Sequence, residues 1–92
     1  MKLWPVQNDR MPHPIHDPKY QVFRQMLLDA RKEKGLQQVE VAECLGKTQS
    51  FVSKYERGER RLDFCEFIEV AAALEINPVE FIKRYRQHIE NT

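Results

Sequence analysis

The chain has 92 residues, of which 41% are hydrophobic and 32% are charged, and its formal net charge is +1. This length favours one domain with little room for a deep substrate cavity, and the balance of apolar and charged residues excludes a wholly disordered chain. No apolar run is long enough to cross a membrane and no signal-peptide pattern follows Met1, so we expect a cytoplasmic protein without a membrane partner. In that compartment Cys44 and Cys65 should be reduced, half-buried thiols, and their spacing matches no metal motif.

Residues 1–17 are predicted to form an N-terminal tail or arm, because this segment holds prolines and no periodic apolar face. Trp4 is expected to pack on the domain or on a partner rather than to do chemistry. His13 and His16 form an H-x-x-H pair in a proline-rich segment that contains no cysteine. We therefore expect no metal site there.

The first helix is predicted over residues 18–34. Asp17 can accept hydrogen bonds from the first free N–H groups, and Pro18 lacks only an N–H that would have no helical partner. Gly35 is expected to end the helix in the left-handed conformation. Apolar residues at spacings of three and four predict one stripe that faces a core, formed by Val22, Phe23, Met26, Leu27 and Ala30.

Four more short helices are predicted, over about 38–45, 48–56, 63–74 and 78–89. Their starts carry capping residues, namely Thr48, Asp63 with Glu66, and Asn77 followed by Pro78 with Glu80. Their inward positions are expected to be Val41, Ala42, Leu45, Val52, Tyr55, Phe67, Ile68, Ala71 and Leu74. No run alternates with period two, so the chain is predicted to be all-α, with residues 18–90 as one compact domain.

The most informative stretch is residues 38–58, where a short helix, a tight turn and a second short helix form a helix-turn-helix. Gly46 can take a positive φ in the turn, and small Ala42 lets the helices cross closely. Positive charge also gathers between residues 47 and 61. The outer face of the second helix is expected to carry donors and no acid, as a phosphate-lined groove requires, through Gln49, Ser50, Ser53, Lys54 and Arg57.

The spacing Q-x-x-x-A-x-x-x-G from Gln38 to Gly46, followed by E-R-G at residues 56–58, resembles the Cro/lambda-repressor-like (XRE-type) helix-turn-helix family. The resemblance covers about residues 20–83 and includes five helices in the family's order. It implies a lambda-repressor-like DNA-binding domain with an N-terminal extension, in a sequence-specific transcriptional regulator that acts as a repressor. The expected partner is double-stranded DNA, at the nucleoid, and no cofactor or metal is expected.

The same resemblance assigns roles to individual residues. Base contacts are expected from Gln49, Ser50 and Lys54, whose side chains can bond adenine and guanine edges. Phe51 either meets a thymine methyl group or packs against the preceding helix. Phosphate contacts are expected from Gln38, Lys47, Ser53, Arg57, Arg60 and Arg61. Arg31 and Glu56 match an ion pair that ties the first helix to the third, and the alternative is that they are two unrelated surface charges.

The last helix is expected to form a homodimer contact, because one short helix in one groove rarely supplies enough affinity. Residues expected in this contact are Phe81, Tyr85, His88 and Ile89. Phe81, Tyr85 and His88 share one stripe, while Ile82 and Ile89 lie on a neighbouring one. The alternative is that all of them complete the core of a monomer.

Two other classes of function compete with this one. The chain could be a DNA-binding antitoxin or a protein-interaction module, with the tail or the last helix engaging a protein partner. An enzyme is not expected, because the sequence has no nucleophile elbow, no phosphate-binding glycine loop and no H-E-x-x-H motif.

Overall fold

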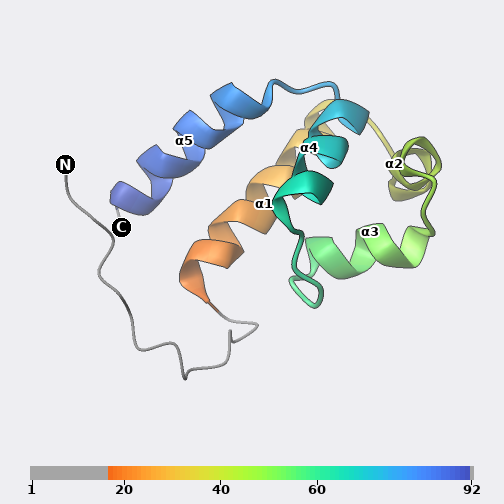
Figure 1. Cartoon of the computed structure of the whole chain (residues 1–92), viewed down its shortest axis with the longest axis horizontal. Coiled ribbons are helices and arrows are strands. Elements are labelled where there is room, and N and C mark those ends of the chain that lie inside the picture. Colours follow the sequence, from red (N-terminus) through yellow and green to blue (C-terminus); the bar gives the residue numbers. More distant parts are fainter. Residues whose placement is uncertain (1–16, 92) are drawn as a thin grey trace.

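The structure is a computed structural model that describes residues 17–91. It contains five helices in this range (Figure 1), which are α1 (Pro18–Glu33), α2 (Gln38–Leu45), α3 (Gln49–Glu56), α4 (Phe64–Ala73) and α5 (Pro78–Glu90). The prediction of an all-α fold with five helices is therefore confirmed. The predictions for Trp4, for the His13 and His16 pair and for a partner that binds the tail fall on residues outside the described range.

The helix ends differ from the predicted ends by one residue at most. The predicted caps Thr48 and Asp63 are confirmed, whereas Lys34 and Leu74, which were expected as the last residues of their helices, are the caps that follow α1 and α4. Asp63 accepts a bond from the Glu66 N–H, and Glu66 accepts one from the Asp63 N–H in return. Such reciprocal bonds satisfy two N–H groups that the helix itself leaves without partners.

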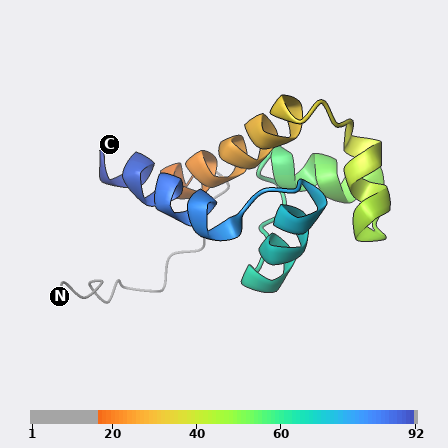
Figure 2. The same cartoon turned by 90° about the horizontal axis from the view of Figure 1, so that it is seen from above.

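The helices form two connected parts (Figures 1 and 2). α5 lies alongside α1 near the C-terminus, and α2 and α3 pack together at the opposite end. α1 reaches from one part to the other and contacts both α3 and α5. The side chains that bury most completely come from all of the first four helices, namely Leu27, Val41, Val52, Tyr55, Val70 and Leu74.

Three predicted positions are corrected by the structure. Ile68 was expected to face the core, but 37% of it is exposed, and Val70 is fully buried instead. A helix turns by about 100° per residue, so Ile68 lies well outside the stripe that Phe67, Val70 and Leu74 define. Cys44 and Cys65 are exposed free thiols rather than half-buried ones.

Within residues 17–91, no helix is both long and apolar enough to pass through a bilayer.

Candidate nucleic-acid interface

α3 follows α2 through a turn that depends on Gly46. This residue has a backbone φ of +67°, a value that residues with a Cβ rarely adopt. The Lys47 N–H closes the turn by donating to the Ala42 carbonyl at 2.9 Å. The hydroxyl of Thr48 then accepts a bond from the Phe51 N–H and caps α3. The turn therefore sets the direction in which α3 leaves α2.

The outer side of α3 carries polar side chains. Gln49, Ser50 and Lys54 are exposed, and Ser53 is half-buried. The acid of this helix, Glu56, is only 4% exposed and points into the protein. The free face of α3 consequently presents amide, hydroxyl and ammonium groups, all of which can donate hydrogen bonds.

The structure brings Arg31 and Glu56 together. Arg31 Nε lies 2.6 Å from one carboxylate oxygen of Glu56, and a second guanidinium nitrogen donates to the other oxygen at 3.1 Å. A third bond runs from the same guanidinium to the Leu36 carbonyl. Because desolvation offsets much of the attraction in a buried pair, its main effect is to position α3 on α1.

Gln38 extends this network to the outer face of α3. Its amide nitrogen donates to Glu56 at 2.7 Å, and its carbonyl oxygen accepts a bond from Gln49 at 3.3 Å. Gln38 was expected to contact a phosphate, and the structure places it at the first turn of α2 with its side chain already bonded at both ends. A continuous chain of polar groups therefore connects Gln49 to Glu56 and Arg31.

Phe51 is half-buried, and its side chain packs against the core. Its ring meets the ring of Tyr55 edge-on, with centroids 5.7 Å apart. The guanidinium of Arg60 lies 4.7 Å from the centroid of Phe51, and the ammonium of Lys47 lies 5.5 Å from it. Phe51 thus gathers two cations, each at a distance that allows cation–π attraction.

The three arginines that follow α3 each have a carboxylate partner. Arg57 bonds Glu59 at 2.8 Å and 3.1 Å. Arg60 pairs with Glu66 at 2.9 Å, and Arg61 pairs with Asp17 at 3.1 Å. All three pairs lie at the surface, where ion pairs add little stability. Lys47 and Lys54 form no ion pair within residues 17–91.

Two residues of α1, which the sequence did not indicate, hold the loop after α3. The Tyr20 hydroxyl donates to the Arg60 carbonyl at 3.2 Å and accepts from the Leu62 N–H at 3.1 Å. Arg24 donates to the Glu56 carbonyl at 2.8 Å and so satisfies the C-terminal end of α3. The backbone at Gly58 lies close to α1. A Cβ at this position would come within 3.1 Å of Arg24 Cδ, so a larger residue would crowd the Arg24 side chain.

The residues predicted for the dimer contact lie in different environments. Phe81 is only 5% exposed and belongs to the core, so its prediction as a contact with a second copy is wrong. Tyr85 is half-buried, packs edge-on against Phe23 and donates its hydroxyl to the Lys19 carbonyl. His88 is exposed and Ile89 is half-buried. Phe81 and Tyr85 therefore pack against the core of the chain itself, whereas His88 on the same stripe does not.

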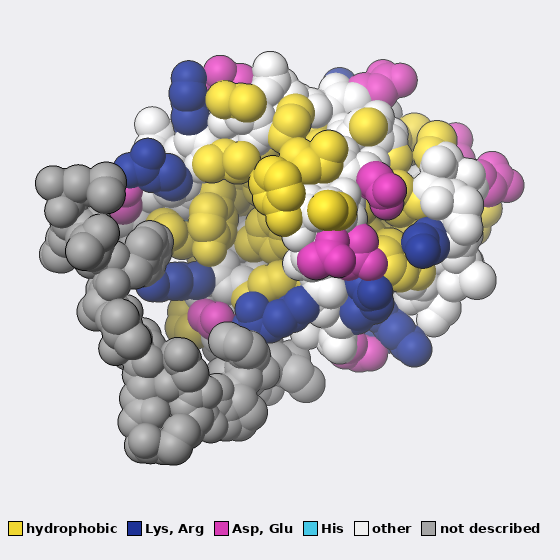
Figure 3. Space-filling model, viewed as in Figure 1, with side chains coloured by type: hydrophobic (Ala, Val, Ile, Leu, Met, Phe, Trp, Pro, Cys, Tyr) yellow, Lys and Arg dark blue, Asp and Glu magenta, His cyan; other side chains and the backbone are white. Residues whose placement is uncertain are grey.

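Exposed apolar side chains instead gather on another face. Figure 3 shows apolar side chains over α4 and the adjoining part of α5. The large members are Phe64, Ile68, Val79 and Ile82, which are 69%, 37%, 57% and 40% exposed. We call these four residues the apolar patch. Exposed apolar side chains that gather on one face often mark a surface that binds another molecule.

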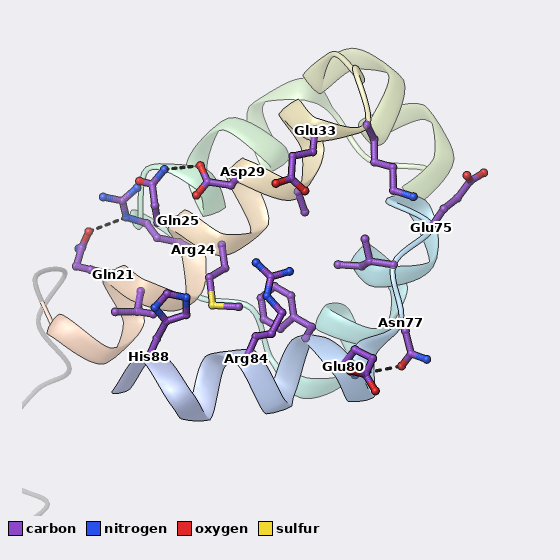
Figure 4. A pocket seen from close by; sticks show the side chains of 16 residues that line it. Gln21, Arg24, Gln25, Asp29, Glu33, Glu75, Asn77, Glu80, Arg84 and His88 are labelled. Atoms are coloured by element: carbon purple, nitrogen blue, oxygen red, sulfur yellow. Dashed lines mark hydrogen bonds between the residues drawn. The ribbon is translucent and has the colours of Figure 1, made fainter. Parts of the chain in front are cut away.

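A separate groove of about 620 Å³ lies between α1 and α5 (Figure 4). Its walls carry both signs of charge, with Asp29 and Glu33 from α1 opposite Arg84 from α5. Across residues 17–91, no three His, Cys, Asp or Glu side chains are placed to hold a metal ion. This groove offers no arrangement of groups that indicates a reaction.

The sequence and fold are similar to known proteins. A helix-turn-helix family model matches residues 27–81. An XRE-family like protein from Pseudomonas syringae pv. tomato is 39% identical, with a TM-score of 0.76 over 80% of this chain and 90% of the other. No curated protein sequence matches the chain.

Two restriction-modification controller proteins are also similar in structure. C.AhdI from Aeromonas hydrophila is 34% identical, with a TM-score of 0.64 over 70% of this chain and 97% of that protein. A variant of C.Esp1396I is 22% identical, with a TM-score of 0.74 over 79% and 97% of the two chains, and shares the fold.

Proposed function

The chain belongs to the XRE-type helix-turn-helix family, whose members are DNA-binding regulators and not enzymes, and from this premise we propose that it is a repressor that reads the major groove with α3. The chain is a DNA-binding transcriptional regulator. We propose that it works in the cytoplasm, at the nucleoid, as its ligand requires. Repression follows when a bound protein covers a promoter, and the chain needs no further domain for that effect.

The observation that supports this proposal best is the outer face of α3. Gln49, Ser50 and Lys54 project from one side of a helix whose acid is turned inward. A glutamine amide can bond the N6 and N7 atoms of adenine, and a lysine can donate to O6 and N7 of guanine. An acidic side chain on the same face would be repelled by the phosphates on both sides of the groove.

The surroundings of α3 suit the backbone of the duplex. Lys47 precedes α3 and three arginines follow it, so cations flank the helix at both ends. We propose phosphate contacts from Gln38, Lys47, Ser53, Arg57, Arg60 and Arg61. Phe51 would act indirectly in this arrangement, because its ring lies beside Lys47 and Arg60 and holds them near the groove edges. Such contacts fix the position of the protein on DNA without reading its sequence.

We further propose that two copies bind together through the apolar patch. Phe64 and Ile68 on α4 and Val79 and Ile82 on α5 are exposed, and a two-fold axis at this surface would cover all four on both copies. A dimer doubles the phosphate and base contacts, which a domain of this size needs for specific affinity. A protein partner of another kind that binds this surface would appear in place of the dimer.

Selection of bound sequences from a random duplex library tests this function. The expected result is a near-palindrome with half-site centres about 10 base pairs, or a multiple of that spacing, apart. Footprinting of the selected site should then show protection of two successive major grooves on one side of the duplex. Selection that enriches no sequence, or binding that does not weaken as salt rises, would contradict the proposal.

A further inference from the structure

We propose that Glu59 occupies, in the free protein, the position on Arg57 that a DNA phosphate takes in the complex. Glu59 must then be displaced on binding, and its carboxylate weakens binding to every DNA sequence. This inference rests on the proposed function. It assigns to Glu59 the role of a residue that competes with the ligand at the edge of the recognition helix.

The geometry of the pair is that of a phosphate complex. Arg57 Nε donates to one oxygen of Glu59 at 2.8 Å, and a terminal nitrogen donates to the other oxygen at 3.1 Å. The remaining terminal nitrogen of Arg57 donates to the Ser53 hydroxyl. Arginine binds carboxylates and phosphates through the same two-pronged edge. A phosphate therefore cannot take that edge until Glu59 leaves it.

Glu59 differs in one respect from the carboxylates that pair with the other two arginines. Glu66 also accepts the Asp63 N–H at the start of α4, and Asp17 also accepts the Lys19 N–H at the start of α1. The hydrogen bonds of the Glu59 carboxylate, within residues 17–91, run only to Arg57. Glu66 and Asp17 hold helix ends, whereas Glu59 serves no helix cap.

The pair adds little to the stability of the fold but affects the charge of the DNA face. The side chains of Arg57 and Glu59 are 54% and 48% exposed, and solvent screens such pairs strongly. The bonds from Arg57 lower the pKa of the Glu59 carboxyl, with the positive charge of Lys54 as a further, smaller cause, so Glu59 stays ionised at neutral pH. A permanent negative charge thus lies beside α3.

The variant Glu59→Gln removes this charge and keeps the side-chain size. Glu90→Gln is the matched control, because Arg86 and Glu90 also form an exposed pair, at 3.3 Å, near the C-terminus and far from α3. Both variants raise the net charge by one and release one arginine. The probe is a random-sequence duplex, with binding followed by fluorescence anisotropy over a series of salt concentrations.

Glu59→Gln is expected to bind the random duplex about two- to fivefold more tightly than the parent at low salt. The slope of log K against log salt should become steeper by about 0.9, which corresponds to one more counterion released, because the parent's displaced Glu59 takes up a cation again and the variant's glutamine does not. Glu90→Gln should bind within about 1.5-fold of the parent, since its pair lies at the C-terminal end of α5, away from α3, and salt screens such distant charges more strongly. Arg57→Ala should abolish the gain, so that Arg57→Ala with Glu59→Gln binds as Arg57→Ala alone.

The outcomes separate the two proposals. If the parent binds no duplex at any salt concentration, the proposed function fails, and this inference fails with it. If the parent binds but Glu59→Gln matches Glu90→Gln in affinity and slope, only the role of Glu59 is overturned. A gain that persists without Arg57 would also overturn it, because the charge would then act without the exchange.

Discussion

Arg31 lies 2.6 Å from Glu56 across 25 residues of sequence, and this bond ties the C-terminal end of α3 to α1. Gln38 donates to the same carboxylate, so helices α1, α2 and α3 meet at one buried acid. The orientation of α3 therefore depends on a polar network as well as on apolar packing. Such a network makes the relative position of the helices specific.

The first prediction concerns this carboxylate. Glu56→Ala should lower the free energy of unfolding by about 3–5 kcal/mol, because Arg31 would remain buried without its partner. Replacing both residues, as Arg31→Met with Glu56→Leu, should recover most of that loss. Urea denaturation of the three proteins measures the effect. If the double variant is no more stable than Glu56→Ala, the loss does not arise from an unpaired buried charge.

The second prediction compares two tyrosine hydroxyls. The Tyr55 hydroxyl is buried and has no hydrogen-bond partner within residues 17–91, so Tyr55→Phe should raise the free energy of unfolding by about 1 kcal/mol. The Tyr20 hydroxyl makes two bonds to the loop after α3, so Tyr20→Phe should lower it by about 1–2 kcal/mol. Both variants delete one oxygen, and each is the control for the other. Equal effects would contradict the assignment of partners.

The third prediction concerns high pH. Burial, and secondly the Glu56 carboxylate, raises the pKa of Tyr55, and burial raises that of Tyr20. Above a pH of about 10 the unfolded chain loses these protons while the folded chain retains them, so stability should fall as pH rises. Tyr55→Phe should flatten this fall in urea titrations at a series of alkaline pH values. An unchanged pH dependence in that variant would show that Tyr55 does not contribute.

The fourth prediction separates the apolar patch from the core. Phe64 is 69% exposed, so Phe64→Ala should leave monomer stability within about 0.5 kcal/mol of the parent but weaken self-association. Phe81 is buried, so Phe81→Ala should cost about 3–5 kcal/mol of folding free energy. Sedimentation of a concentration series measures association, and urea denaturation measures folding. Self-association that is unaffected by Phe64→Ala would place the dimer contact elsewhere.

Local signals in the sequence predicted much of the fold. Asp17, Asp63 and Asn77 each accept backbone N–H bonds at a helix start, and these interactions span only two or three residues. Gly46 likewise requires nothing beyond its own turn. Because such interactions depend on residue type and spacing alone, they can be identified without knowledge of tertiary structure.

Contacts between distant segments could not be predicted in this way. The hydroxyl of Tyr20 bonds residues 40 and 42 positions away, and no periodicity in the sequence points to that pairing. The last helix shows the same limit, because Phe81 and Ile82 both lie on apolar stripes and the spacing does not say which stripe meets the core. Arg57 was expected to be available to DNA, and its pairing with Glu59 depends on how the loop turns after Gly58.

The last prediction concerns the reading of sequence by α3. Gln49→Ala and Lys54→Ala should each relax the preference at one or two base positions, at about 1–3 kcal/mol for each bidentate pair of hydrogen bonds that the alanine removes. Arg57→Ala should instead weaken binding to all sequences alike, because a phosphate contact carries no sequence information. Lys83→Ala, which removes the same charge from the exposed side of α5, is the control for Lys54→Ala.

Selection from a random library, repeated with each of these variants, measures the preference position by position. Gln49 also bonds Gln38, which bonds Glu56, so Gln49→Ala should shift the preference without a large loss of stability, because the buried end of the network remains intact. If both α3 variants select the same site as the parent with equal discrimination, α3 does not read the bases. If Lys83→Ala alters the preference as much as Lys54→Ala, the effect reflects overall charge, since a direct contact acts only at its own base pair.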